Sequence, residues 1–300
     1  MSVTELREKS AAKAGVPLTR NKNLFPSGRG FVDYESEQSM EQSRSVKNLI
    51  DFVVKSAQAA RADDIPFHHL EFDRVFPGDF YKAMLEAMPD ESDYRAMSGK
   101  SKIGSSRPDG KPTRAKIDLF PEYIRHLPPE KRAVWDAVGC VLRSKELEKI
   151  FMQRLAPGLK RRFGANFAKI RMYPVPILTR DIPGYRVFKH TDSLWKGITV
   201  QLYLPPDNSA THIGTIFHEL LPDGRKPKKA QMPFAPNTGY AFAVGDDTWH
   251  SADPVGPEVR TRDSILLTYF VDAGVWRFLR NRGRRSGNLV LNELRSLRRG

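Results

Sequence analysis

The sequence has very little cysteine and no long apolar run. Only one of its 300 residues is a cysteine, Cys140, so a disulfide within the chain is excluded. No apolar stretch approaches the roughly 20 residues that a membrane-spanning helix needs. The first residues, MSVTELREKSAAKAG, lack the apolar segment of a secretory signal. We therefore expect a cytoplasmic protein with no membrane span.

Acidic residues are outnumbered by basic ones. The chain has 49 Lys and Arg against 35 Asp and Glu, which gives a net charge of +14. Half of this excess lies in residues 277–300, which contain eight arginines and one acidic residue, Glu293, for a net charge of +7. Such a segment is either a solvated basic tail or a docking surface for an anionic partner, and the sequence leaves both open.

The first half of the chain shows helical periodicity. Apolar residues recur at helical spacing in residues 45–62, and further helices are predicted within 76–90 and 128–163. Residues 93–114 are rich in Gly, Ser, Lys and Arg, which predicts a long polar loop and a candidate lid or substrate loop. Residues 1–44 are polar and interrupted by Pro and Gly, so we expect an irregular or mobile arm there.

The pattern changes after Gly164 to short β-rich runs separated by Gly, Pro, Asn and Asp. Runs of this length and spacing predict a β-sandwich or jelly roll, and helices followed by strands predict an α+β arrangement. The expected divisions are the arm (1–44), a helical support region (45–165), a β core (166–272) and a basic C-terminal extension (273–300). The eight predicted strands lie within residues 167–175, 185–192, 198–205, 212–220, 229–236, 239–245, 248–255 and 262–272.

The run ITVQLYL at 198–204 alternates strictly between two kinds of side chain. Ile198, Val200, Leu202 and Leu204 fall on one face, whereas Thr199, Gln201 and Tyr203 fall on the other. We expect the aliphatic face to pack under the N-terminal helices. The polar face would line a barrel interior or meet solvent, and the alternation alone does not decide between these.

A candidate metal site comes from two segments far apart in the sequence. His190 and Asp192 are two residues apart near a strand end, so their side chains project to one face. His250 follows fifty-eight positions after His190. Two imidazoles and one carboxylate form a facial triad that binds iron(II) and leaves coordination positions open for O₂ and a co-substrate. The other histidines of this region, His212 and His218, have no carboxylate two positions away and are expected to be ordinary polar residues.

A candidate carboxylate site follows on the last predicted strand. Arg262 and Ser264 share a face there, and the planar guanidinium of arginine suits bidentate capture of a carboxylate. Arg260 has the same parity and remains an alternative. A dicarboxylate held at this position by one end could chelate the metal with its other end.

These motifs together resemble those of the iron(II)/2-oxoglutarate-dependent dioxygenases, and in particular the prolyl-hydroxylase-like branch. The resemblance covers about residues 167–272 and includes the HxD motif, the distal histidine and the Arg-x-Ser, along with YP, GY, TVQLYL, GT and WHSADPV in the expected order. It implies a double-stranded β-helix (jelly-roll or cupin-like) core supported by N-terminal helices. It also implies iron(II), 2-oxoglutarate and O₂ as cofactor and co-substrates, with Tyr203 and Tyr173 as further candidates to contact 2-oxoglutarate.

By this resemblance we expect an enzyme that hydroxylates an unactivated C–H bond of a small molecule and releases succinate and CO₂. Three alternatives stay open: a protein-residue hydroxylase of the prolyl type, a nucleic-acid-directed oxygenase, and a cupin-like binding protein without turnover. By the same resemblance, nucleic-acid-directed oxygenases carry a second arginine well after the first on this strand. The run RDSILLTYF, residues 262–270, has none, which weakens the nucleic-acid alternative.

Overall fold

The computed structural model describes residues 29–97, 103–105 and 112–272. The chain forms two compact units, residues 1–43 and residues 44–300. The described part of the first unit is the beginning of helix α1, and apart from the extent of this helix the description below concerns the second unit. The predicted basic extension at 273–300 and part of the predicted loop at 93–114 lie outside the described residues.

The described residues form six α-helices, three short 3-10 helices and thirteen strands. None of these helices is both long and apolar enough to cross a membrane. The helices are α1 Arg29–Ala59, α2 Gly78–Glu86, α3 Pro121–Ile124, α4 Pro129–Leu142, α5 Lys145–Arg154 and α6 Ala156–Phe163, with η1 Glu91–Asp93, η2 Phe167–Lys169 and η3 Thr211–Ile213. The strands are β1 Arg61–Asp63, β2 His69–Phe72, β3 Arg95–Ala96, β4 Ile103–Ser105, β5 Arg114–Asp118, β6 Met172–Asp181, β7 Tyr185–His190, β8 Lys196–Tyr203, β9 Thr215–His218, β10 Lys228–Met232, β11 Gly239–Ala243, β12 His250–Ala252 and β13 Arg262–Val271.

Helix α1 is longer than the sequence pattern predicted. We expected an irregular segment through residue 44, but the helix begins at Arg29. Residues 31–59 contain neither Pro nor Gly, the two residues that most disfavour a helix interior. The apolar periodicity used for the prediction begins only near residue 46, so it missed the polar first half of the helix.

The predicted helical stretch at 128–163 is confirmed but is divided into three helices. Pro129 occupies the first turn of α4, where its missing N–H costs nothing. Ser144 caps α5 by accepting a hydrogen bond from the Leu147 amide at 3.4 Å. The chain turns at Leu155 because Pro157 lies in the first turn of α6 and cannot continue α5. Helix α6 ends at Phe163 and is followed by Gly164, whose φ of 73° suits glycine.

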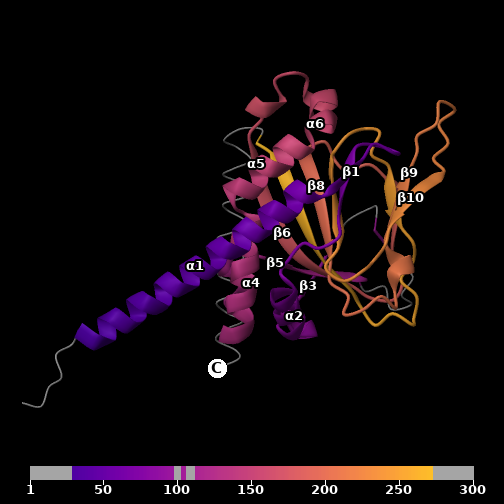
Figure 1. Cartoon of the computed structure of the whole chain (residues 1–300). Coiled ribbons are helices and arrows are strands. Elements are labelled where there is room, and N and C mark those ends of the chain that lie inside the picture. The colour runs from indigo at the N-terminus through magenta and orange to yellow at the C-terminus, as the bar shows by residue number, and fades with distance from the viewer. Residues whose placement is uncertain (1–28, 98–102, 106–111, 273–300) are drawn as a thin grey trace, which may run out of the picture. The chain divides into compact units, whose positions relative to one another are not determined.

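The eight strands from β6 to β13 alternate between two antiparallel sheets, except that β9 and β10 follow one another in the smaller sheet. Four lie in the larger sheet in the order β11-β8-β13-β6, and four in the smaller sheet in the order β10-β9-β12-β7. This order is that of a double-stranded β-helix, so the predicted α+β jelly-roll core is confirmed by the chain's own topology. The larger sheet lies between the helices α4 to α6 and the smaller sheet (Figure 1).

The alternation of β8 places its two faces as predicted. Ile198, Val200 and Leu202 are buried in the core that the larger sheet shares with the helices, which also contains Trp135 and Leu147. The opposite face of β8 points between the two sheets. The second core lies there and is rich in aromatic side chains: Phe67, Tyr185, Tyr203, Phe217, Phe234, Tyr240 and Phe242. The polar face of β8 therefore lines the barrel interior.

Additional strands extend both sheets beyond the eight-stranded core. β2 pairs with β11 at one edge of the larger sheet, and β5 pairs with β6 at the other. Both fall where we predicted no strand, β5 beginning at the last residue of the expected loop. β6 itself runs to Asp181, whereas the prediction ended it at residue 175. Its two prolines, Pro174 and Pro176, lie beyond the last β5 pair at Ile177, where β6 is an edge strand and tolerates a missing N–H.

Gly214 marks a close approach of two backbones. A Cβ added to Gly214 would lie 1.7 Å from the Met232 carbonyl oxygen and 3.0 Å from the Phe234 amide nitrogen. We expect Gly214→Ala to lower the free energy of unfolding by about 1–3 kcal/mol, as overpacked sites typically do, measured by urea denaturation. Gly78→Ala is the matched control, because no atom lies within 4 Å of its added Cβ. Equal denaturation midpoints for the two variants would contradict the expectation.

Candidate functional site

Two histidines and an aspartate converge at one end of the space between the sheets. Potential ligand atoms of His190, Asp192 and His250 all lie within 4.8 Å of one another. His190 ends β7 and His250 begins β12, and the two are cross-strand partners whose ring centroids are 4.3 Å apart. The His250 ring also lies 5.2 Å from that of Phe242 in the aromatic core. The fold thus assembles the three side chains of the predicted triad into one cluster.

Both histidines are oriented with one ring nitrogen toward a backbone carbonyl. His190 Nδ1 lies 2.9 Å from the Phe188 oxygen, and His250 Nδ1 lies 3.0 Å from the Thr248 oxygen. A carbonyl only accepts hydrogen bonds, so each Nδ1 carries a proton and each Nε2 is the ring nitrogen that would bind a metal. This is the arrangement that typically orients metal-binding imidazoles.

Asp192 is held as a carboxylate. Thr199 Oγ1 donates to its Oδ2 and Lys196 Nζ to its Oδ1, both at 2.6 Å. Burial raises the pKa of Asp192, but the charge of Lys196 and the hydrogen bonds from Lys196 and Thr199 outweigh burial and hold that pKa well below its ordinary value. An ionised carboxylate beside two imidazoles is a suitable donor set for iron(II).

Arg262 is buried at the start of β13, only 2% exposed. Its Nε donates to the Ile213 carbonyl and its Nη1 to Asp181 Oδ2, each at 3.0 Å. Its guanidinium lies 5.5 Å from the ring centroids of both Tyr203 and Phe234, so it faces the space between the sheets. Burial opposes its charge, but Tyr203 and Asp181 raise its pKa, so it stays a cation. The alternative, Arg260, is exposed.

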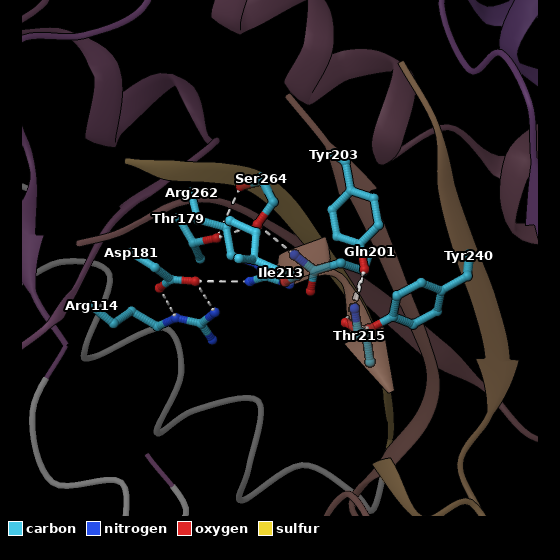
Figure 2. Close-up of polar contacts among 10 residues, drawn as sticks. All are labelled: Arg114, Thr179, Asp181, Gln201, Tyr203, Ile213, Thr215, Tyr240, Arg262 and Ser264. Atoms are coloured by element: carbon cyan, nitrogen blue, oxygen red, sulfur yellow. Dashed lines mark hydrogen bonds and ion pairs between the residues drawn. The ribbon is translucent and has the colours of Figure 1, made fainter. Parts of the chain in front are cut away.

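Tyr203 takes part in a hydrogen-bonded group beside Arg262 (Figure 2). Its hydroxyl donates to Thr215 Oγ1 at 3.0 Å and accepts from the Thr215 amide at 2.9 Å. Tyr240 donates to the same Thr215 oxygen at 3.0 Å. Burial raises the pKa of Tyr203 although Arg262 opposes it, and burial raises that of Tyr240 as well. Both phenols therefore stay protonated donors.

Ser264 lies next to Arg262 on the same face, and its hydroxyl already has partners. Gln201 Nε2 donates to it at 2.5 Å, and Thr179 Oγ1 lies 3.0 Å away. Thr179 donates its own proton to the Ser264 carbonyl at 3.0 Å, so the Ser264 hydroxyl is the donor toward Thr179. In this arrangement Ser264 orients Gln201, whose amide is a second polar group facing the interior.

Tyr173 is not brought to Arg262. It stacks on Phe270, with ring centroids 5.6 Å apart and an interplanar angle of 25°. In the β6–β13 ladder Tyr173 pairs with Phe270 and Asp181 pairs with Arg262, so the two pairs lie near opposite ends of the ladder. Phe270 also pairs with Lys196 of β8, which places Tyr173 near the metal-triad end.

Several polar residues of this site were missed by the sequence analysis: Arg114, Thr179, Asp181, Thr199, Gln201, Thr215 and Tyr240. For two of them, Thr199 and Gln201, the signal was present, since they occupy the predicted polar face of β8. The aromatic alternation of GYAFA, residues 239–243, is compatible with Tyr240 facing inward. Arg114 and Asp181 carried no such signal, because their strand segments were not predicted.

Comparison with known proteins gives structural neighbours alone. No protein-family model and no curated protein sequence matches the chain. Similar solved structures include a Pseudomonas putida prolyl-4-hydroxylase, with 14% identity and a TM-score of 0.43 over 74% of this chain and 98% of that one. Another is AviO1 from Streptomyces viridochromogenes, with 14% identity and a TM-score of 0.41 over 74% of this chain and 95% of that one. A third is an oxidoreductase of the 2OG-Fe(II) oxygenase family from Burkholderia pseudomallei, with 12% identity and a TM-score of 0.42 over 67% of this chain and 84% of that one.

Proposed function

We propose that this chain is an iron(II)- and 2-oxoglutarate-dependent oxygenase that hydroxylates an unactivated C–H bond of a small molecule and releases succinate and CO₂. The observation that carries the proposal is the cluster of His190, Asp192 and His250 within 4.8 Å, in a core whose interior also holds the buried cation of Arg262. A set of potential metal donors and a cation suited to bind a carboxylate face the same space between the sheets.

The donor set fits iron(II) on chemical grounds. Two imidazoles and one ionised carboxylate can bind one face of an octahedral metal and leave the opposite face open. When bound, the metal supplies the O₂ chemistry, which no amino acid side chain provides. The protein's part is to hold His190 and His250 through their Nδ1 hydrogen bonds and Asp192 through Thr199 and Lys196.

The carboxylate end of the site fits a dicarboxylate co-substrate. Arg262 keeps its charge in a buried position, where a hydrogen bond to a carboxylate is stronger than in water. Tyr203 and Tyr240 stay protonated and border it. A dicarboxylate bound to Arg262 by one end would reach toward the metal triad with the other. We further propose a cytoplasmic enzyme, in accordance with the single cysteine.

Anaerobic titration tests this function. Adding 2-oxoglutarate to the iron(II)-loaded protein without O₂ is expected to produce a weak visible charge-transfer band, and admitting air is expected to produce succinate. Zinc(II)-loaded protein is the control and should give neither signal. Iron binding without the band or succinate would instead indicate a cupin-like binding protein without turnover and would contradict the proposal.

A further inference from the structure

Three buried charged side chains form a row across neighbouring strands of the larger sheet. Asp181 on β6 pairs in register with Arg114 on β5 and with Arg262 on β13. Arg114 Nε and Nη2 donate to the two carboxylate oxygens of Asp181 at 2.6 and 2.8 Å, and Arg262 Nη1 donates at 3.0 Å. Figure 2 shows the carboxylate between the two guanidinium groups. Side-chain exposure is 10% for Arg114, 0% for Asp181 and 3% for Arg262.

The three side chains of this row have a net positive charge. Two guanidinium groups and one carboxylate sum to +1, and Asp181 is the one carboxylate that pairs with either arginine among the residues the structure describes. Buried charges are costly unless they are paired, so this interior favours a further anion. Without Arg114, Asp181 would neutralise Arg262 alone and the row would have no net charge.

We propose that Arg114 offsets the negative charge of Asp181, so that the row keeps a net positive charge beside Arg262. The affinity for the co-substrate carboxylate then depends on Arg114 as well as on Arg262. Arg114 is then a positioning residue that acts through Asp181, while Arg262 contacts the ligand. The inference rests on the proposed function. It also gives β5, a strand outside the eight-stranded core, a role in co-substrate affinity.

A purely structural role is the competing explanation for Arg114. The two hydrogen bonds to Asp181 join β5 to β6, and the guanidinium lies 4.4 Å from the Tyr185 ring centroid. A structural role depends on these contacts, whereas the proposed role depends on charge. Variants that change one without the other separate the two explanations.

The test compares the Kd of 2-oxoglutarate for iron(II)-loaded variants, titrated anaerobically. We expect Arg114→Gln to weaken 2-oxoglutarate binding at least tenfold, since the row becomes neutral. Arg114→Lys keeps the charge and is expected to stay within about threefold of the wild type. The double variant Arg114→Gln, Asp181→Asn returns the row to +1 and is expected to recover most of the lost affinity. Iron(II) affinity should be unchanged throughout.

Arg180→Gln is the matched control. Arg180 forms the same kind of two-bond ion pair with Asp263, at 2.8 and 3.4 Å, one residue along the same strands β6 and β13. Successive residues of a strand point to opposite faces, so this pair lies on the other side of the sheet. Its loss is expected to lower the melting temperature without changing the Kd of 2-oxoglutarate.

The outcomes are distinguishable from failure of the proposed function. Wild-type protein that binds iron(II) but no 2-oxoglutarate would refute the proposed function itself. If the wild type binds 2-oxoglutarate, unchanged affinity in Arg114→Gln, or a double variant no tighter than Arg114→Gln, overturns the role of Arg114. If Arg114→Gln does not fold, the test rests on Arg114→Lys, which keeps the positive charge. A loss of 2-oxoglutarate affinity in Arg114→Lys would then overturn the proposal.

Discussion

Replacing His250 with alanine is expected to abolish the iron(II)-dependent visible band and all succinate formation. His250 and His190 come from neighbouring strands and provide two of the three donors that lie within 4.8 Å. Losing one donor leaves a two-ligand site that competes poorly with water. Removing a residue that only orients a metal ligand typically lowers metal affinity by about 10–100-fold. We therefore expect the loss of a ligand to lower iron(II) affinity by more than about 100-fold.

His218→Ala is the matched control for this prediction. His218 is also buried, 3% exposed, and stands on β9 beside β12. It lies 2.8 Å from Ser251 Oγ, and Ser251 points away from His250 because successive residues of a strand alternate. Iron(II) affinity is measured by competition with a colorimetric chelator, and folding by circular dichroism. Iron affinity lost equally in both variants would show that a structural change, and not the donor set, is responsible.

The parts of this fold that the sequence predicts best are those with a local physical signature. The alternation in β8 shows which side chains meet the helices, because one face buries Ile198, Val200 and Leu202 and the other carries polar groups. A one-residue shift would exchange these faces, so the pattern fixes the orientation of the strand. Thr199, Gln201 and Tyr203 consequently point between the sheets, where the candidate site lies.

The parts that could not be predicted depend on pairing between distant segments. Arg114 was assigned to a polar loop because residues 93–114 are rich in Gly, Ser, Lys and Arg. Its strand β5 is five residues long and is defined by its register with β6, which no local pattern encodes. Asp181 was missed for a related reason, since the predicted strand ended at residue 175, within the part of β6 that contains Pro174 and Pro176. The prolines are tolerated because β5 does not extend that far.

The residues that hydrogen-bond to the metal triad also could not be predicted from a local pattern. HxD and a distant histidine suggest a metal site by residue type, yet the support of Asp192 by Lys196 and Thr199 depends on how the chain returns into β8. Roles that depend on residue type can be predicted, whereas roles that depend on hydrogen-bond geometry need the fold.

Replacing Arg262 with methionine is expected to remove most of the affinity for 2-oxoglutarate while sparing iron(II). Arg262 is the buried cation of β13 that faces Tyr203 and Phe234. Truncating one partner of a buried, hydrogen-bonded charge pair costs about 2–5 kcal/mol, which corresponds to a Kd raised about 30-fold or more. The metal donors His190, Asp192 and His250 are left intact, so iron(II) affinity should stay at the wild-type value.

Arg260→Met is the control for the assignment on the last strand. Arg260 has the same parity as Arg262 but is exposed, so we expect its removal to leave the Kd of 2-oxoglutarate unchanged. Arg262→Met and Arg114→Gln both make the buried row neutral, yet Arg262→Met should have the larger effect, because it also removes the groups that contact the ligand. Lost affinity in Arg260→Met with normal binding in Arg262→Met would show that the carboxylate is held outside the space between the sheets. Equal losses in Arg262→Met and Arg114→Gln would mean that net charge alone determines binding and that neither guanidinium contacts the co-substrate directly.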